Sequence, residues 1–501
     1  MKKYDAIVVG SGISGMTLAL LLGMNGRSVL LLEKGPRIGG SMTRFTRQGI
    51  PFDTGFHFTG GFCKDGILQD MLVTLGMRDY TKPIYLFKKE CNRFNFEAEK
   101  VEYALPSGYG DTIAQLKEYF PGEERGIERY FEMVRSVCAR TISMDLRKIS
   151  LYPDVLDEDY ISLDAVLNEV TDNQLLKGLL SVYSMCYGVK PSEIAFAAHS
   201  RICFSLYQAL ARVEGGGEAF IDGFRECFAK YNIEVRCNCT ISECTEIQNK
   251  QVGRFVLSTG EELATGHCVF TIHPHEIMKL LPQELLSKAF LNRINEFEPS
   301  AGFFSFYGVV NGDDTGDDFH PTIFSLFPTA DINRIFDLKS LDSLPLVIMT
   351  SIEEAKGTRY RAICALELSF PEHVEAWKDS KRGNRPSGYV AYKEERVESI
   401  RERITRVYPE YGETLKVMDA ASMLTYKDYL HSPEGAAYGI KQKIGQFNLF
   451  GKLPLRNVYA AGQSSMLPGI VGAMMSSFIV ARSIMGIEEY GRFIKQRLGS
   501  S

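Results

Sequence analysis

The chain has 501 residues and a mass of 56.2 kDa, with 45% hydrophobic and 24% charged residues. This composition is typical of a globular protein that is long enough for two or more packed units. Its net charge of −5 and its pI of about 6.0 provide no basic surface, so we expect no nucleic-acid partner. No apolar run approaches the roughly 18 residues needed to span a membrane.

The eleven cysteines are expected to be reduced thiols of a cytoplasmic protein. Only Cys237, Cys239 and Cys244 cluster, in a C-x-C-x4-C pattern. This pattern has no CxxC pair and no nearby histidine, so we predict no metal site. We expect Cys237 and Cys239 to face the same side of a strand.

The N-terminal residues predict a strand, a tight turn and a helix in direct succession. The apolar run at 6–9 leads into GSGISG at 10–15, which has the spacing G-x-G-x-x-G, and an apolar helical stretch follows at 16–22. In such a unit the phosphates of a dinucleotide meet unpaired N–H groups at the helix start. A second strand at 28–32 ends at Glu33, whose carboxylate can bind the hydroxyls of an adenosine ribose. We therefore predict a dinucleotide-binding site.

The residues after Glu33 indicate FAD as the dinucleotide. A nicotinamide enzyme normally continues into the next helix, whereas this chain has the glycine pair Gly39–Gly40 and then GIPFDTGFHFTGG at 49–61. We interpret the second segment as a polar and aromatic strand that passes the ribityl chain of FAD. His57 lies on this predicted strand, where it either faces the flavin or sits in the core; it is our candidate catalytic residue.

The C-terminal part predicts a second contribution to the same cofactor. Residues 457–461 are expected to form a strand, 462–467 a loop, and Pro468–Gly469 the start of a helix. The N–H groups of Ile470 and Val471 would then point at the flavin edge that becomes negative on reduction.

The middle of the chain predicts a further nucleotide-binding segment and a second unit. Residues 211–247 indicate a glycine loop, a helix and a strand, followed by a hairpin at 253–272. Residues 112–210 have helical periodicity, whereas 300–310 and 344–369 indicate strands of a mixed sheet. The charged segment 311–320 is expected to be a solvated loop. Aromatic residues of the first predicted strand either line a substrate tunnel or belong to the core: Phe303, Phe304, Phe306 and Tyr307.

At this point the chain resembles the FAD-dependent carotenoid desaturase, carotenoid isomerase and retinol saturase family, within the amine-oxidase-like flavoproteins. The segments that carry the resemblance are VVGSGISG, FDTGFHFTGG, VEGGGEAFIDGF, SPEGAAYG and AGQSSMLPGIVGA, and they occur in family order. The resemblance implies an α/β fold with a discontinuous Rossmann-like FAD-binding domain of the amine-oxidase type at 1–75, 205–285 and 415–501. An interrupted α+β substrate domain would occupy 76–204 and 286–414.

The resemblance also implies which positions contact FAD. They are Gly10, Ser11, Gly12, Ile13, Ser14, Gly15, Glu33, Lys34, Gly39, Gly40, Ser41, Ile241, Gly462, Gln463, Gly469, Ile470 and Val471. Many proteins of the superfamily have an acidic residue where this chain has Gln463, so a carboxylate contact there is not expected.

We therefore expect an oxidoreductase that acts on carbon–carbon double bonds of an apolar carotenoid- or retinoid-type substrate, as a saturase, desaturase or isomerase. Hydride transfer would occur at flavin N5, with His57, Tyr426, Tyr429 and Tyr438 as polar candidates for proton transfer. The chain contains one strand-GxGxxG-helix-acid unit, so the electron partner is expected to be a quinone, oxygen or a redox protein. Peripheral membrane contact stays open for a cytoplasmic enzyme with such a substrate. The alternatives are a flavin amine oxidase and a non-catalytic lipid escort protein with an FAD fold.

Overall fold

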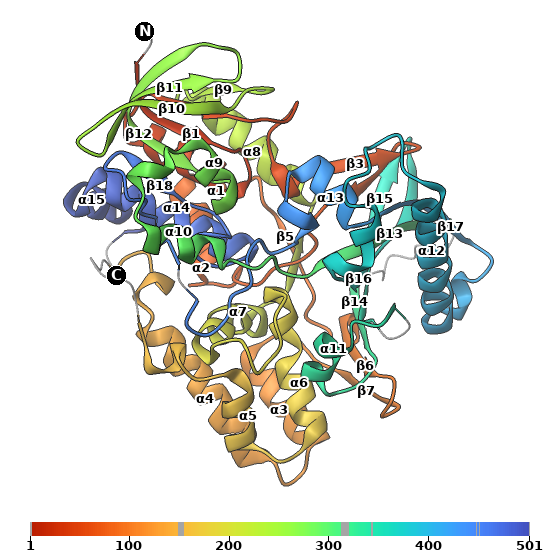
Figure 1. The fold of residues 1–501 in the computed structure, drawn as a ribbon. Coiled ribbons are helices and arrows are strands. Elements are labelled where there is room, and N and C mark those ends of the chain that lie inside the picture. Colours follow the sequence, from red (N-terminus) through yellow and green to blue (C-terminus); the bar gives the residue numbers. More distant parts are fainter. Residues whose placement is uncertain are drawn as a thin grey trace.

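The computed structural model describes residues 3–148, 155–311, 320–341, 344–446, 448–449 and 451–499. It contains two seven-stranded sheets and a group of helices, which lie at the upper left, the right and the bottom of Figure 1. Within the described residues, no helix combines the length and apolar character needed to cross a membrane.

The first sheet has the strand order β10-β11-β12-β1-β2-β9, and β18 pairs with β12. Strand β1 is central and pairs in parallel with both β2 and β12. The strands are β1 (Lys3–Val9), β2 (Val29–Leu32), β9 (Glu234–Arg236), β10 (Ile241–Gln248), β11 (Gln251–Leu257), β12 (Glu262–Phe270) and β18 (Val458–Ala460). The first sheet thus combines residues from the two ends and the middle of the chain.

Both faces of the first sheet are covered because its parallel strands are apolar on both sides. Ala6 and Val8 of β1 pack into one cluster, whereas Ile7 and Val9 pack into another on the opposite face. Helices of the first cluster are α1 (Ile13–Met24), α2 (Ile67–Leu75), α8 (Gly217–Lys230), α14 (Gly469–Met485) and α15 (Ile487–Leu498). The second cluster, on the opposite face, contains residues of the hairpin strands β10 and β11 and of helices α9 (Pro274–Leu280) and α10 (Lys288–Asn295).

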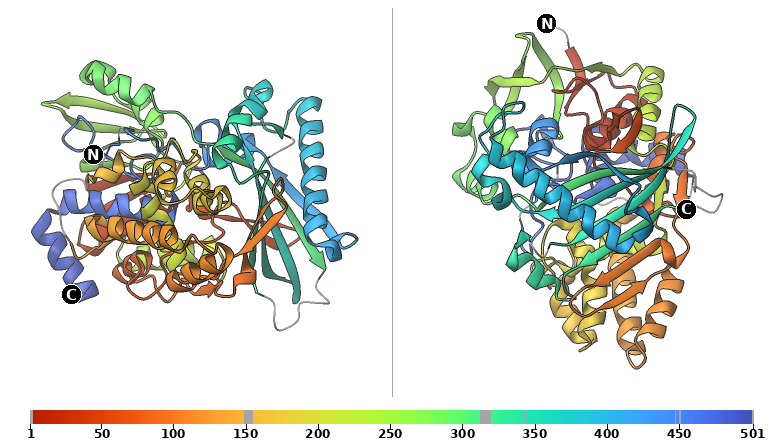
Figure 2. Two further views of the ribbon diagram at one scale, coloured as in Figure 1. Left: turned by 90° about the horizontal axis from the view of Figure 1, so that it is seen from below. Right: turned by 90° about the vertical axis from the view of Figure 1, so that its right-hand side faces the viewer.

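The second sheet has the order β17-β13-β16-β15-β14-β6-β7 and is mixed, because β14 and β6 are parallel while the other neighbours are antiparallel. Its strands are β6 (Asn92–Phe96), β7 (Val101–Ala104), β13 (Gly302–Asn311), β14 (Thr322–Phe327), β15 (Leu346–Ala355), β16 (Thr358–Ser369) and β17 (Leu415–Ala421). The long helix α12 (Ser387–Val407) lies across one face, as the right-hand view of Figure 2 shows.

The remaining elements surround the region between the sheets. A helical unit consists of α3 (Tyr109–Tyr119), α4 (Glu124–Arg140), α5 (Leu163–Val170), α6 (Gln174–Ser181) and α7 (Phe196–Gln208), and α11 (Ile332–Leu338) packs against it. Two small sheets pair β3 (Arg44–Arg47) with β4 (Ile50–Asp53) and β5 (Pro83–Tyr85) with β8 (Ala211–Val213). Helix α13 (Met423–Leu430) follows β17.

The structure confirms the predicted fold class, the helical segment at 112–210 and the mixed second sheet. Two local predictions are wrong: the strand expected across 49–61 ends at Asp53, and Cys237 and Cys239 lie between β9 and β10 rather than on a strand. Strand β17 belongs to the second sheet although 415–501 was assigned to the FAD-binding segments. The other domain boundaries stay predictions, and the loop expected at 311–320 lies, apart from its ends, outside the described residues.

Candidate functional site

The turn between β1 and α1 requires glycine at its two ends. Gly10 has a φ of +97°, which L side chains rarely adopt. A Cβ at Gly15 would lie 1.9 Å from the carbonyl oxygen of Gly10. The hydroxyl of Thr271 donates to the carbonyls of Val9 and Gly10, both at 3.0 Å, and fixes the turn to the end of β12. The conformation therefore follows from the chain's own packing.

At the middle glycine of the motif, Gly12, neither backbone conformation nor packing within the described residues requires glycine. Gly12 has a φ of −62°, and apart from its immediate chain neighbours no atom of the described residues lies within 4 Å of a Cβ built there. The backbone of Gly40 closes one side, since its Cβ would lie 3.2 Å from the Gly12 Cα. A glycine that leaves open space at the start of α1 suits a bound phosphate, which would meet the free N–H groups of the helix. The residues present therefore fit the pyrophosphate of a dinucleotide.

Glu33 lies beside this turn and is already hydrogen-bonded to it. One carboxylate oxygen accepts from the Ser11 N–H at 3.0 Å and from the Ser11 hydroxyl, and the other accepts from the Gly35 N–H at 2.6 Å. A carboxylate has about four acceptor positions, so one is left for a ribose hydroxyl. The N–H of Cys239 donates to the Glu33 carbonyl at 2.9 Å, which places the segment leading to Ile241 at this end of the site.

Serine side chains connect the N-terminal turn to the C-terminal helix. Helix α14 begins directly after Pro468, as the sequence predicts. The Ser476 hydroxyl accepts the Gly462 N–H at 2.7 Å, and the Ser477 hydroxyl donates to the Ser14 carbonyl at 2.8 Å. The structure thereby brings the first and last predicted segments of the site together.

The start of α14 also has unoccupied space. Gly469 has a φ of +76°, and no described atom lies within 4 Å of its Cβ position. Ile470 and Val471 follow it as half-buried residues. The Gln463 amide donates to the Ala437 carbonyl at 3.4 Å, so the SPEGAAYG segment lies against this loop.

The other predicted contact positions take varied places. Ile13 is buried at the first position of α1, and Gly39 has a φ of +122° beside α8. Lys34 and Ser41 are both exposed.

His57 lies in the loop after β4 and is 8% exposed. Neither ring nitrogen has a hydrogen-bond partner among the described residues. Burial lowers the pKa of His57 to about 4, although the Asp53 carboxylate acts in the opposite direction. The ring is therefore neutral at pH 7, and its two nitrogens are available to a bound ligand or water.

A buried group of four charges lies next to His57, and sequence reasoning missed it. Arg44 contacts Asp53 at 2.8 Å and Glu353 at 2.7 Å, and Arg212 contacts Glu353 at 3.1 Å and also pairs with Asp53. Burial alone would raise the pKa of Asp53, but the guanidiniums of Arg212 and Arg44 hold it below its usual range. The four residues come from β3, β4, β8 and β15, so the group joins the second sheet to the region around His57.

The tyrosine candidates do not converge on one point. The Tyr426 hydroxyl is buried against Ser305 and lies 3.3 Å from that of Tyr307. Tyr429 is 56% exposed, and its ring packs under a surface arginine. Tyr438 is half-buried beside Phe303, with a ring distance of 6.0 Å.

Strand alternation separates the four aromatic residues of β13. Phe304 and Phe306 pack in the core under α12 and do not line a tunnel. Phe303 faces the other side, where it and Leu467 of the C-terminal loop pack against the cluster of the helical unit. This side combines apolar side chains with the loop at the start of α14.

Comparisons with known proteins agree with this arrangement. A family model described as an NAD(P)-binding Rossmann-like domain matches residues 8–75. An all-trans-retinol 13,14-reductase of Danio rerio is 25% identical over 97% of this chain and 86% of its own length. Prolycopene isomerase 2 of an Oncidium hybrid cultivar is 30% identical, but over only 30% of this chain and 25% of its own.

The fold has a counterpart among solved structures. Wild-type putrescine oxidase bound to putrescine has a TM-score of 0.65 and 14% identity, covering 97% of this chain and 99% of that chain. At this identity the likeness shows a shared fold and does not identify a substrate.

Proposed function

The chain belongs to the carotenoid desaturase, carotenoid isomerase and retinol saturase family of amine-oxidase-like flavoproteins, and from this premise we propose that it binds FAD and acts on carbon–carbon double bonds of an apolar polyene. The observation that carries the proposal is the open space at Gly12, which the chain's own packing does not require. FAD supplies the hydride acceptor or donor when bound.

The roles of the chain's residues follow from their places. The starts of α1 and α14 direct N–H groups at the pyrophosphate and at the flavin edge, respectively, and Glu33 accepts a ribose hydroxyl. His57 is neutral and holds a polar atom of the ligand or a water molecule through its unpartnered nitrogens. Phe303 and Leu467 belong to the apolar wall against which the polyene packs, where exclusion of water and correct orientation are the main tasks of the protein.

The cofactor part of the proposal is tested by replacing Gly12 with valine. The added side chain enters space that no described atom uses, so the protein should fold but purify without flavin absorbance. Gly110→Val is the matched control, because Gly110 lies far along the chain in α3 and its Cβ position is equally open. Retention of stoichiometric flavin by Gly12→Val would show that the nucleotide lies elsewhere.

The substrate part is tested by mass spectrometry of lipids extracted from the purified protein, followed by anaerobic mixing of the reduced and oxidised enzyme with retinoids and carotenoids. We expect a polyene to reoxidise or reduce the flavin. Peroxide release on amines, without a response to polyenes, would instead support the amine oxidase alternative that the shared fold with putrescine oxidase leaves open.

We further propose that the protein takes its substrate from an anionic membrane surface through the segment 82–89. Ile84 and Phe87 are 38% and 57% exposed, and the neighbouring Lys82, Lys88 and Lys89 are exposed. Apolar side chains flanked by lysines fit the interface of an anionic bilayer. The segment continues into β5, which pairs with β8 beside the charge group near His57.

Liposome sedimentation tests this surface. Phe87→Ser should weaken binding to anionic vesicles, whereas Leu338→Ser, which changes an equally exposed residue on α11, should not. Equal binding by the two variants would place the membrane contact elsewhere, and absence of binding by the wild type would refute it.

A further inference from the structure

A polar cavity of about 250 Å³ lies on the second sheet where β6, β7 and β14 meet the C-terminal turns of α12. Phe94 and Phe96 of β6 pack into the helical unit, so Arg93 and Asn95, which alternate with them, face the opposite side of the sheet. The cavity therefore opens on the face away from the helical unit. The residues that matter for its chemistry are Arg93, Glu97, Phe324, Leu326, Arg403 and Arg406.

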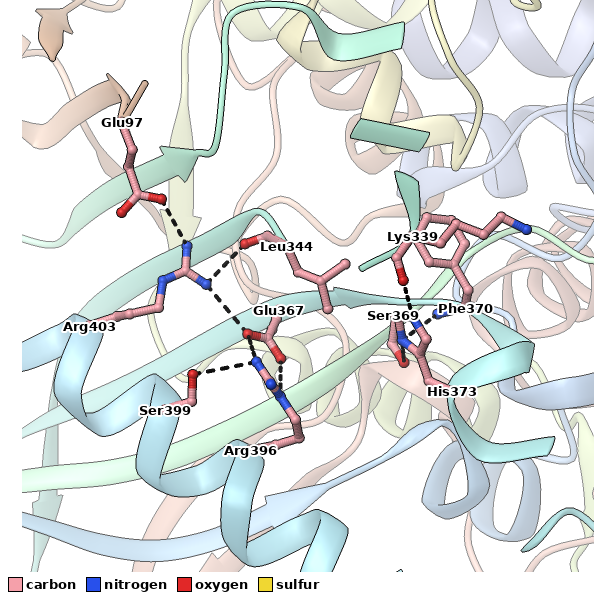
Figure 3. A network of polar contacts seen from close by, with 10 residues as sticks. All are labelled: Glu97, Lys339, Leu344, Glu367, Ser369, Phe370, His373, Arg396, Ser399 and Arg403. Carbon is pink, nitrogen blue, oxygen red and sulfur yellow. Dashed lines mark hydrogen bonds and ion pairs between the residues drawn. The ribbon is translucent and has the colours of Figure 1, made fainter. Parts of the chain in front are cut away.

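Behind this cavity, Arg396 and Arg403 share the carboxylate of Glu367, but they bind it unequally. Glu367, whose side chain is 1% exposed, accepts from Nε and Nη2 of Arg396 at 2.9 and 2.7 Å. This bidentate pair is complete, and Arg403 reaches the same carboxylate only at 3.4 Å through Nη1 (Figure 3). The Nη1 atom also donates to the Leu344 carbonyl at 2.9 Å.

The other terminal nitrogen of Arg403, Nη2, has no hydrogen-bonded carboxylate among the described residues. Nη2 of Arg403 lies 3.7 Å from Oε2 of Glu97, and Nη1 of Arg406 lies 3.7 Å from Oε1 of the same carboxylate. Arg93 pairs with Glu102 at 2.7 Å through Nε, and its guanidinium stacks on the Phe324 ring. The arginines named in and behind the cavity therefore outnumber the glutamates by four to three. The side chain of Arg403 is only 13% exposed.

We propose that this cavity binds a small organic anion, whose carboxylate or phosphate oxygens lie between Arg403 and Arg406 and whose apolar part packs on Phe324 and Leu326. Guanidinium groups match the planar geometry of such oxygens and form strong charge-assisted hydrogen bonds with them. The volume is below the roughly 300–1,000 Å³ of pockets for drug-sized ligands, which restricts the ligand to the size of a small metabolite. The proposal is independent of the dinucleotide site and of the proposed reaction.

Isothermal titration of the purified full-length holoprotein with benzoate, phenyl phosphate and inorganic phosphate tests the site. We expect one of the two aromatic anions to bind more tightly than inorganic phosphate, which lacks an apolar part, and their comparison distinguishes carboxylate from phosphate recognition. If none of the three probes gives a heat of binding at millimolar concentrations, the proposal is overturned. It is also overturned if inorganic phosphate binds as tightly as both aromatic anions.

Three variants locate the binding. Arg406→Gln changes a side chain that is 70% exposed and should weaken binding about tenfold or more, the loss expected for a charge-assisted hydrogen bond. Glu97→Gln removes the competing carboxylate and should tighten binding. Arg401→Gln is the matched control on the same helix, because Arg401 is exposed and pairs with Glu398. Equal affinities of the wild type, Arg406→Gln and Glu97→Gln would refute the site.

Discussion

Replacing His57 with phenylalanine should remove a defined part of the pH dependence of stability. Burial lowers the pKa of His57 to about 4 in the folded chain, whereas an unfolded histidine has its ordinary value of about 6.5. As the pH falls below 6.5 the unfolded state takes up a proton that the folded state does not, so stability is lost. From these two values, the loss between pH 7 and pH 5 is about 2 kcal/mol, and the loss continues at lower pH until it levels off below the folded pKa of about 4.

Urea unfolding of the wild type and His57→Phe at pH 7 and pH 5, at equal cofactor content, measures this difference. The variant should lose about 2 kcal/mol less than the wild type over that interval. At pH 7 it should be nearly as stable, because the two ring nitrogens have no partner to lose among the described residues. His320→Gln, at an exposed site, provides the control. Parallel losses for the wild type and His57→Phe would refute the inferred neutral histidine.

Two further perturbations test the neighbouring groups. Glu33→Ala should weaken FAD binding by about 1.5–3 kcal/mol, the range for a hydrogen bond to a charged group, and an unchanged flavin dissociation constant would contradict that role. Arg212→Met leaves Asp53 and Glu353 with a single arginine and should destabilise the fold by about 3–5 kcal/mol in urea unfolding, whereas the exposed pair of Arg47 should contribute at most about 1 kcal/mol when Arg47→Met removes it. Equal effects of the two arginine variants would show that the buried charges are compensated by solvent.

The turn glycines could be predicted from the sequence because their requirements are local or involve a fixed motif. Gly10 and Gly15 are five residues apart and touch each other, so their spacing together with the flanking strand and helix identifies the turn. The placement of Gly462 next to α14 was also predictable, since strand, loop and helix follow one another directly. The domain division and the assigned cofactor contacts stay predictions.

The errors arise where long-range pairing decides the structure. Strand β4 ends at Asp53 because its partner β3 begins at Arg44, opposite that residue, so His57 lies in a loop. The chain turns at Asn238, which has a φ of +53°, and this separates Cys237 from Cys239. Glu353 binds Arg212 across 141 positions of sequence, and a local sequence pattern does not predict such a contact.

The contact between α1 and α14 determines when the proposed nucleotide site can form during synthesis of the protein. The turn at Gly12 is synthesised well before the α14 serines that bond to it, because Ser476 and Ser477 contact Ser14 across 462 and 463 positions of sequence. At about 5–20 residues per second, the nascent chain waits roughly 20–90 s before both halves of the proposed nucleotide site are present. For the proposed FAD site, capture of the cofactor therefore has to follow synthesis of α14, and chains truncated before Gly469 should accumulate without it.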